Sequence, residues 1–330
     1  MRIGDNIYPS LSDRDKIKNS MVGRTPIERL LTTKQCPGGN LGEAHLAKLD
    51  LREANLSGAK LLFANFNRSD LDRANFSGAD LSFATLVNAS FANADLSGID
   101  GRGTQWFEAT LTEANLCGAD LGFASLVNAK IDRASLSGAR LDGTNAIGAN
   151  LSHTDLSGTD LGGANLGDAT LIEANLADAN LQDARLVKAD LRGANLRGAN
   201  LQDANLLGAN LQDADLTDAK LSGVNLAGAN LDGTMGIDGI FSPPIVPSAT
   251  PSATPSATPS AATTGVAKVQ TPATPKLCKG SAALPKTMKP HLPNRRTSSG
   301  VSVASNLSKL GFPLPAGMED RAVFLSDRAG

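Results

Sequence analysis

The stretch 191-LRGANLRGANLQDANLLGANLQDADL-216 repeats every five residues, with Leu at each step and Ala two residues before nearly every Leu. The same register runs from Leu41 to Leu231 without a slip. Of its 39 positions, 32 are Leu, three are Phe and one is Ile, and the exceptions are Gly101, Trp106 and Ala146. A repeat of this regularity decides the fold before any other feature of the chain is considered.

A period of five fits neither a helix nor a flat strand. Five residues of an α-helix turn by roughly 500°, so successive Leu would drift around the helix and form no apolar face. In a plain strand, residues five apart point to opposite faces. A coil satisfies both spacings, because Ala and Leu share the inner side of a short extended segment and the next three residues contain a corner.

A longer period of twenty residues sets the number of corners. Ser-Gly or Cys-Gly follows the central residue at six positions twenty apart, from 57–58 to 157–158. Opposite charges alternate down another column of the same period, which consists of Glu53, Arg73, Asn93, Glu113, Arg133, His153 and Glu173. Four pentapeptides per coil stack like residues above one another. The sequence therefore predicts an all-β, quadrilateral solenoid of nearly ten coils over residues 41–235, with type II turns at the Ser-Gly corners.

The run A-[DN]-L-x-x, present at 54–58 and 79–83, resembles the repeat of the pentapeptide repeat family. The resemblance covers residues 41–235, and it implies a right-handed quadrilateral β-helix. The lead-in 30-LLTTKQCPGGNL-41 is similar to that of cyanobacterial members, in which a second Cys often stands at the place of Gly39.

Segments of different composition flank the repeats. In the N-terminal segment, residues 1–40, the run 25-TPIE-28 is typical of a capping box with Pro at the first helical position. It predicts a short helix over 26–33 that lays Ile27, Leu30 and Leu31 on the first coil.

Beyond the repeats, residues 236–300 are predicted to form an apolar plug containing Ile237, Ile240 and Phe241, followed by a disordered linker rich in Pro, Ser, Ala and Thr. Residues 301–330 are expected to be disordered or to form a short docking segment.

Composition excludes several classes of protein. The net charge is −2, but residues 41–235 contain 25 acidic and 14 basic side chains, a net charge of −11. Cys36, Cys117 and Cys278 are far apart and predict neither a disulfide framework nor a zinc site. Residues 1–20 contain no apolar h-region, and no apolar run approaches membrane-spanning length, so we expect a cytoplasmic protein.

Catalysis is not expected from a solenoid filled by its own side chains, because such a fold offers no concave pocket. His45, His153 and His291 are scattered along the chain. The Asn and Asp that precede each Leu are too regular to be ligands. We therefore predict neither enzymatic activity nor a catalytic, cofactor or metal site.

One coil departs from the pattern. Gly101 leaves a hole where Leu belongs, and Trp106 is oversized for the next position. Two interpretations follow from the sequence. Trp106 fills the space that Gly101 vacates, or a local bulge presents Arg102 and Trp106 as a contact site.

Apolar residues also recur at outward positions on one part of the solenoid. They form a predicted strip of Phe63, Phe83, Val87, Phe107, Phe123, Val127 and Ile147. Exposed apolar surface of this kind often marks an interface. Cover by the chain's own terminal segments and the simple preference of strands for β-branched residues are the alternative explanations.

Two functions are compatible with these features. The first is a non-catalytic scaffold that uses the strip to bind an unknown protein partner or a second copy. The second is implied by the family resemblance, some members of which mimic DNA and bind type II topoisomerases; the acidic repeats permit it. A continuous acidic face would favour mimicry, whereas acidic ladders compensated by Lys and Arg would favour the scaffold. DNA binding itself is not expected, and no membrane span is predicted.

Overall fold

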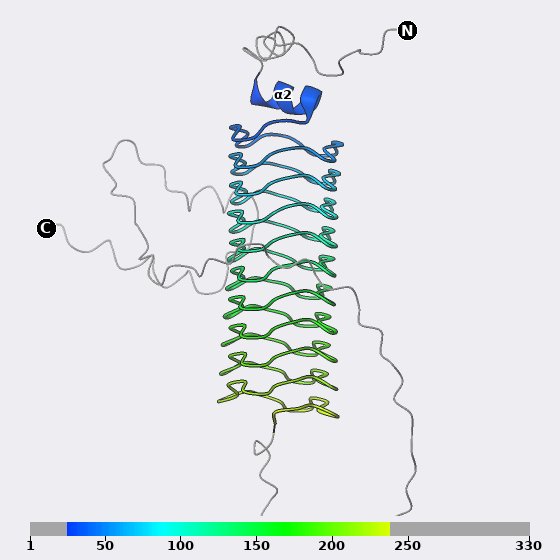
Figure 1. The fold of residues 1–330 in the computed structure, drawn as a ribbon, viewed down its shortest axis with the longest axis vertical. Helices are drawn as coiled ribbons and strands as arrows, with labels where there is room; N and C mark the ends of the chain where they lie inside the picture. Colours follow the sequence, from blue (N-terminus) through cyan, green and yellow to red (C-terminus); the bar gives the residue numbers. More distant parts are fainter. Residues whose placement is uncertain (1–24, 238–330) are drawn as a thin grey trace, which may run out of the picture. The chain divides into compact units, whose positions relative to one another are not determined.

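The computed structural model describes residues 25–237. Figure 1 shows a column of stacked coils, with the helix α2 at the end where the described chain begins. The predicted linker, the segment 301–330, and Ile240 and Phe241 of the predicted plug lie outside the described residues.

The coils are joined by parallel bridges at every fifth residue. Each bridge pairs a residue with the one twenty positions further along, from Gln35 and Asn55 at one end to Asp215 and Met235 at the other, without a gap. A coil therefore contains twenty residues and has four sides of five residues each. The predicted period and the number of sides are both present in the structure.

Backbone hydrogen bonds between coils recur with the same period. The Leu56 N–H donates to the Asn75 carbonyl at 2.7 Å, and the Gly58 N–H donates to the Ser77 carbonyl at 2.8 Å. Each coil thus serves as the template for the next. Stacking satisfies the backbone groups that a single coil would leave unpaired.

Many corners are closed by two local hydrogen bonds. The Ala54 N–H donates to the Leu51 carbonyl at 3.0 Å. The Ser57 N–H, which takes no part in the bonds between coils, donates to Oδ1 of Asn55 at 3.1 Å. This second bond explains the Asn or Asp before so many Leu residues, because a side-chain oxygen there satisfies a corner N–H.

The corners share one backbone conformation, whether or not they contain glycine. The second central residue of the turn has a positive φ at Gly58 (62°), and equally at Glu53 (62°), Phe63 (57°) and Arg68 (60°). A positive φ at this position alone is the signature of a type II turn. The glycine column therefore marks one of four equivalent corners, and the glycine pattern by itself misses the other three.

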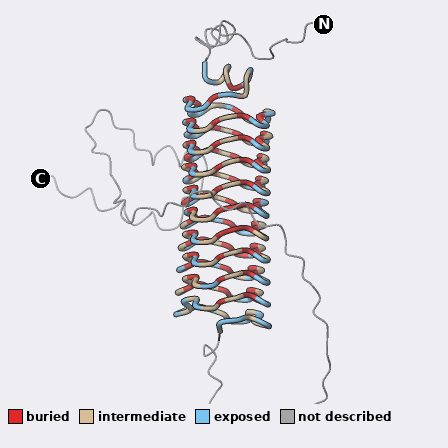
Figure 2. The backbone as a smooth tube through the Cα atoms, in the orientation of Figure 1, coloured by how far each residue is buried: buried red, intermediate tan, exposed pale blue. Residues whose placement is uncertain are grey.

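The Leu and Ala ladders fill the interior. Figure 2 shows buried residues recurring in successive coils, except in the last one. Four aromatic side chains replace Leu in neighbouring coils and form a continuous interior cluster. Ring centroids are 5.8 Å apart for Phe66 and Phe76, 5.5 Å for Phe76 and Phe91, and 5.1 Å for Phe91 and Trp106. The Trp106 indole N–H donates to Oγ1 of Thr104 at 2.7 Å, so the buried indole has its partner.

One of the two interpretations of the coil around Gly101 is wrong. The backbone contains no bulge that presents Trp106, because Gln105 bridges to both adjacent coils and Trp106 is fully buried. The other interpretation, that Trp106 fills the space that Gly101 vacates, stays a prediction. A Cβ placed on Gly101 would come 2.9 Å from Cδ2 of Leu121 and 3.4 Å from Cδ1 of Ile99.

The helix α2 spans Pro26–Thr33, the residues at which the sequence predicts a helix. Its capping box is formed: the Glu28 N–H donates to Oγ1 of Thr25 at 3.3 Å, and the Thr25 N–H donates to Oε2 of Glu28 at 3.0 Å. Leu30 is fully buried and Ile27 packs against the core. Leu31 is 52% exposed, so its predicted contact with the first coil is wrong.

The two ends of the described solenoid differ in burial. Near α2, Leu41 and Leu46 are buried, whereas Leu221, Leu226 and Leu231 in the last coil are half-buried. Ile237 packs against this end of the core, as expected for the start of the predicted plug.

The charged column forms only in part. Arg73 pairs with Glu53 at 2.9 Å and His153 pairs with Glu173 at 3.4 Å. Arg133 instead pairs with the adjacent Asp132 at 3.1 Å. The period of twenty brings opposite charges into reach, but long side chains choose among several partners at the surface.

The two cysteines of the described residues differ in their state. Cys117 is disulfide-bonded. Cys36 is free and buried. Gly39 lies directly against it, since a Cβ placed on Gly39 would collide with the Cys36 sulfur.

Candidate functional site

The coil of residues 58–77 defines the four sides of the solenoid, and each side continues every twenty residues. We call 58–62 side 1, 63–67 side 2, 68–72 side 3 and 73–77 side 4. On each side the first, third and fifth residues face outward, while the second and fourth are the buried Ala and Leu of the ladders. Each side therefore presents a leading edge, a centre and a trailing edge, each of which forms a column down the solenoid.

The leading edge of side 2 holds three exposed phenylalanines. Phe63 is 55% exposed, Phe83 54% and Phe123 74%. All three are themselves corner residues, with φ values of 57°, 57° and 58°. A bulky residue seldom adopts this left-handed conformation, which favours glycine and asparagine. Their presence at these corners is therefore not explained by backbone preference.

The phenylalanine rings lie along the edge, each toward the next coil. Phe63 stacks on Phe83 with ring centroids 5.5 Å apart and an interplanar angle of 23°. A Cβ placed on Gly103 would come 2.7 Å from the Phe83 ring, and one on Gly143 would come 2.7 Å from the Phe123 ring. The Phe83 ring thus packs against Gly103, and the Phe123 ring packs against Gly143. Together the rings form a nearly continuous aromatic edge.

The trailing edge of the same side contains the remaining members of the predicted strip. Phe107 is 39% exposed and Ile147 is 37% exposed, while Val87 and Val127 are half-buried. This column and the column of phenylalanines are the two edges of side 2.

A central column separates the two edges, and the sequence analysis overlooked it. It consists of Asn65, Thr85, Gln105, Ser125 and Asn145. Their amide and hydroxyl groups can both donate and accept hydrogen bonds. Reading every outward residue at a period of twenty would have revealed the column, whereas a search for apolar residues passes over it.

Side 2 is also uncharged over much of its height. Among the described coils, no ionisable side chain occupies an outward position of side 2 between residues 63 and 167. Charges bound this stretch at Glu43 and His45 above it, and at Asp183 and Arg185 below it. Each of the other three sides carries several charged residues over the same coils.

Some of the acidic residues elsewhere on the coils are paired with arginine. On side 1, Arg102 pairs with Asp100 at 2.6 Å, and Arg140 pairs with Asp120 at 3.4 Å and with Asp142 at 3.0 Å. Partial burial alone would raise the pKa of Asp100, but hydrogen bonds from Arg102 hold this pKa below its usual value. Between residues 100 and 142, arginines thus interrupt the acidic residues of side 1.

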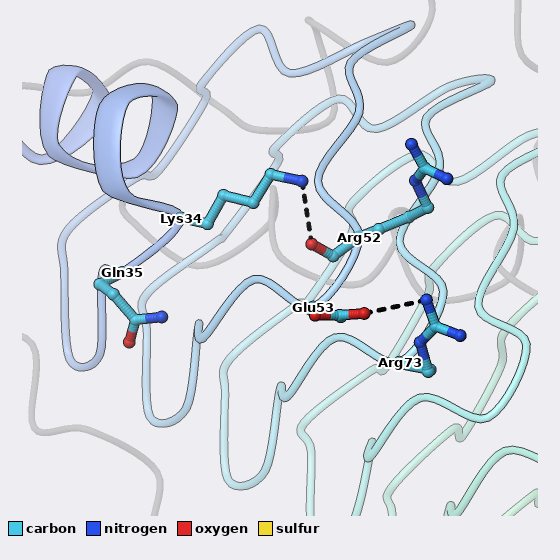
Figure 3. A pocket seen from close by; sticks show the side chains of 5 residues that line it. All are labelled: Lys34, Gln35, Arg52, Glu53 and Arg73. Atoms are coloured by element: carbon cyan, nitrogen blue, oxygen red, sulfur yellow. Dashed lines mark hydrogen bonds and ion pairs between the residues drawn. The ribbon is translucent and has the colours of Figure 1, made fainter.

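A shallow depression lies near α2, and Figure 3 shows the residues around it. Its volume is about 430 Å³, and it is lined by Lys34, Gln35, Arg52, Glu53 and Arg73. Lys34 Nζ donates to the Arg52 carbonyl at 3.1 Å, and Arg73 pairs with Glu53. Its charged groups bind one another, so this depression assigns no ligand. Across residues 25–237, no helix is long and apolar enough to cross a membrane.

A family model for pentapeptide repeats matches eight copies in the chain, at 40–73, 74–98, 109–145, 124–163, 134–171, 159–198, 174–212 and 194–233. The chain belongs to the pentapeptide repeat family. Its fold is accordingly the right-handed quadrilateral β-helix of that family.

Solved structures of this family are similar to the chain. HetL, a pentapeptide repeat protein involved in heterocyst differentiation regulation from the cyanobacterium Nostoc sp. strain PCC 7120, is 32% identical, with 68% of this chain and 97% of HetL covered and a TM-score of 0.60. Trypsin-treated QnrB1, a plasmid-mediated fluoroquinolone resistance protein, is 16% identical, with 59% and 88% covered and a TM-score of 0.30. No curated protein matches the chain.

Proposed function

We propose that this protein is a non-catalytic scaffold that binds another protein through side 2, over residues 63–167. The observation that carries the proposal is the uncharged side edged by Phe63, Phe83 and Phe123. An uncharged surface loses little hydration when it is covered, and exposed aromatic rings supply much contact area.

Strand preference does not account for this surface. Val87 and Val127 lie where β-branched residues are favoured, but the three phenylalanines occupy left-handed corners. A bulky surface residue that is kept in an unfavourable backbone conformation points to a role of its side chain other than stabilising the corner. The rigid coils support that role, because they hold the rings in a fixed array.

The alternative role, mimicry of DNA toward a type II topoisomerase, gains no support from the outer surface. Arg102 and Arg140 pair with three aspartates of side 1, Asp100, Asp120 and Asp142. Many other aspartates accept hydrogen bonds at corners, as Asp80 does from the Ser82 N–H at 3.0 Å. A scaffold that contacts protein through side 2 is the better account of the molecule.

Site-specific photo-crosslinking in cells tests the proposal. A photoreactive residue at Thr85 or Gln105 should give a discrete protein adduct, because both lie in the centre of side 2. The matched control is the same residue at Ser97, which is equally half-buried and lies on side 4. Adducts of equal yield from both sides, or none from side 2, would contradict the proposal.

A further inference from the structure

We infer that the partner of side 2 is a second copy of this chain, so that two solenoids pack side 2 against side 2 across a two-fold axis. The inference rests on the proposed function and names its partner. A two-fold interface must be self-complementary, because the same patch serves both subunits. Three features of side 2 meet this condition.

The first feature is the order of the columns. Side 2 has an apolar edge, a polar centre and a second apolar edge. When this side faces its own copy, either parallel or antiparallel, every edge meets an apolar edge and the centre meets the centre. Phe83 and Phe123 are covered by the second copy in both arrangements.

The second feature is the hydrogen-bonding chemistry of the centre. Ser125 and Thr85 carry hydroxyl groups, and Gln105 carries an amide. Each of these groups both donates and accepts, so it can bond to its own copy across the axis. A central column of carboxylates could not do so, because carboxylates only accept.

The third feature is the absence of charge. A two-fold contact brings each residue close to the same residues of the second copy, so charged columns would place like charges together. Side 1 would bring Asp100 and Asp120 near their own copies, and side 3 would do the same with Asp70 and Asp72. Over residues 63–167, side 2 is the side of these coils that avoids this repulsion.

The size of side 2 predicts a weak dimer. The uncharged coils span roughly 25–30 Å along the axis, and the side is about 13 Å wide. This area is about half of the 800 Å² per partner that a stable specific interface usually buries. We therefore expect a reversible dimer whose fraction rises with protein concentration.

Sedimentation velocity of the full chain over a wide range of concentration is the first test. The wild type should shift from monomer to dimer as concentration rises. The variant Phe83→Ser/Phe123→Ser should weaken the dimer at least about tenfold, because it removes two exposed rings from the interface. The control Ile172→Ser, a half-buried apolar position on side 3, should leave the dimer unchanged. Circular dichroism shows whether each variant remains folded.

Cysteine crosslinking locates the contact. Thr85→Cys, Gln105→Cys and Ser125→Cys are prepared in a Cys117→Ser/Cys278→Ser background, mixed in equal amounts and treated with a short bismaleimide. The mixture covers both orientations, since each centre residue then meets a cysteine in parallel or antiparallel packing. It should give at least about tenfold more crosslinked dimer than Ser97→Cys on side 4.

Different failures have different meanings. A wild type that stays monomeric throughout, or crosslinks that are as abundant from Ser97→Cys, would overturn the inference. If the chain is monomeric but photo-crosslinking at Thr85 captures a foreign protein, the inference fails and the proposed function stands. If there is neither a dimer nor an adduct from side 2, both fail.

Discussion

Side 2 and side 4 of the same coils share one backbone and carry opposite outer chemistry. Inside, Leu86 of side 2 and Leu96 of side 4 are equally buried. Outside, one coil of side 2 presents Phe83, Thr85 and Val87, whereas side 4 of that coil presents Asn93, Asp95 and Ser97. The coil closes its own hydrogen bonds and its own core, so the outer residues are free to differ. Their pattern therefore carries information about what each side contacts.

The corner bonds sharpen this contrast. On side 4, Asp95 Oδ1 accepts the Ser97 N–H at 3.1 Å, which closes the corner locally. On side 2, Thr85 stands in place of Asn or Asp, and the Val87 N–H donates instead to Oδ1 of Asn67 in the preceding coil at 2.9 Å. At Thr85, side 2 thus lacks the residue that closes the corner locally, whereas Asn65 of the same column retains that bond to the Asn67 N–H at 3.0 Å.

The largest expected effect tests whether the two sides have equivalent interiors. Leu86→Ala and Leu96→Ala should each lower the free energy of unfolding by about 2–5 kcal/mol, because each leaves a cavity in the core of the same coil. Urea unfolding followed by circular dichroism measures both. A loss at Leu86 less than half of that at Leu96 would show that the two sides are not equivalent inside.

A smaller effect distinguishes the corner at Gly103, against which the Phe83 ring packs, from an ordinary glycine corner. Gly98→Ala should cost about 1 kcal/mol, since Gly98 has a φ of 62° and no neighbouring atom within 4 Å of an added Cβ. Gly103→Ala should cost roughly 1 kcal/mol more, because its Cβ would also displace the Phe83 ring. Thermal or urea unfolding measures the difference. Adding Phe83→Ala to both variants should remove it; if the difference persists, the ring does not rest on Gly103.

The smallest effect concerns pH. On side 4, hydrogen bonds from the Thr217 hydroxyl and N–H hold the pKa of Asp215 below its ordinary value of 3.8. Because the pKa is lowered on folding, the stabilisation is present above pH 3.8 and is lost as the pH falls through the folded-state pKa. NMR titration of the carboxyl carbon measures this pKa, which Thr217→Val should raise.

Side 2 supplies the matched control for the pH experiment. No outward residue of its described coils between 63 and 167 titrates, so association through side 2 should not change between about pH 5 and 9. A dimer that weakens sharply within that range would place the contact on a charged side.

Much of the fold could be predicted from the sequence because its signals are local and periodic. The spacing of Leu and Ala sets the inner face, and the run 25-TPIE-28 contains the complete capping box of α2. Predictions failed where several partners compete for one charge. Arg133 pairs with the adjacent Asp132 and not with a residue of its own column. Such choices depend on side-chain directions that a repeat pattern does not contain.

The candidate site was predicted in part. The seven apolar residues of the strip could be named from the sequence, because apolar residues recur at two outward positions with a period of twenty. The central column was missed, because amide and hydroxyl residues look ordinary until both edges are known to flank them. The packing of Phe83 against Gly103 and of Phe123 against Gly143 was also missed, since the direction of these two side chains depends on the folded corner.

By itself, the sequence determined that this chain forms a four-sided β-solenoid, because a strict repeat of five within a period of twenty can bury its Leu and Ala in no other regular way. Only the tertiary structure decided that Phe83 and Val87 flank one uncharged side, and that Trp106 belongs to a buried aromatic cluster. Those facts follow from how successive coils stack and from where each corner directs its side chains. Both depend on contacts between residues that are twenty apart in the chain.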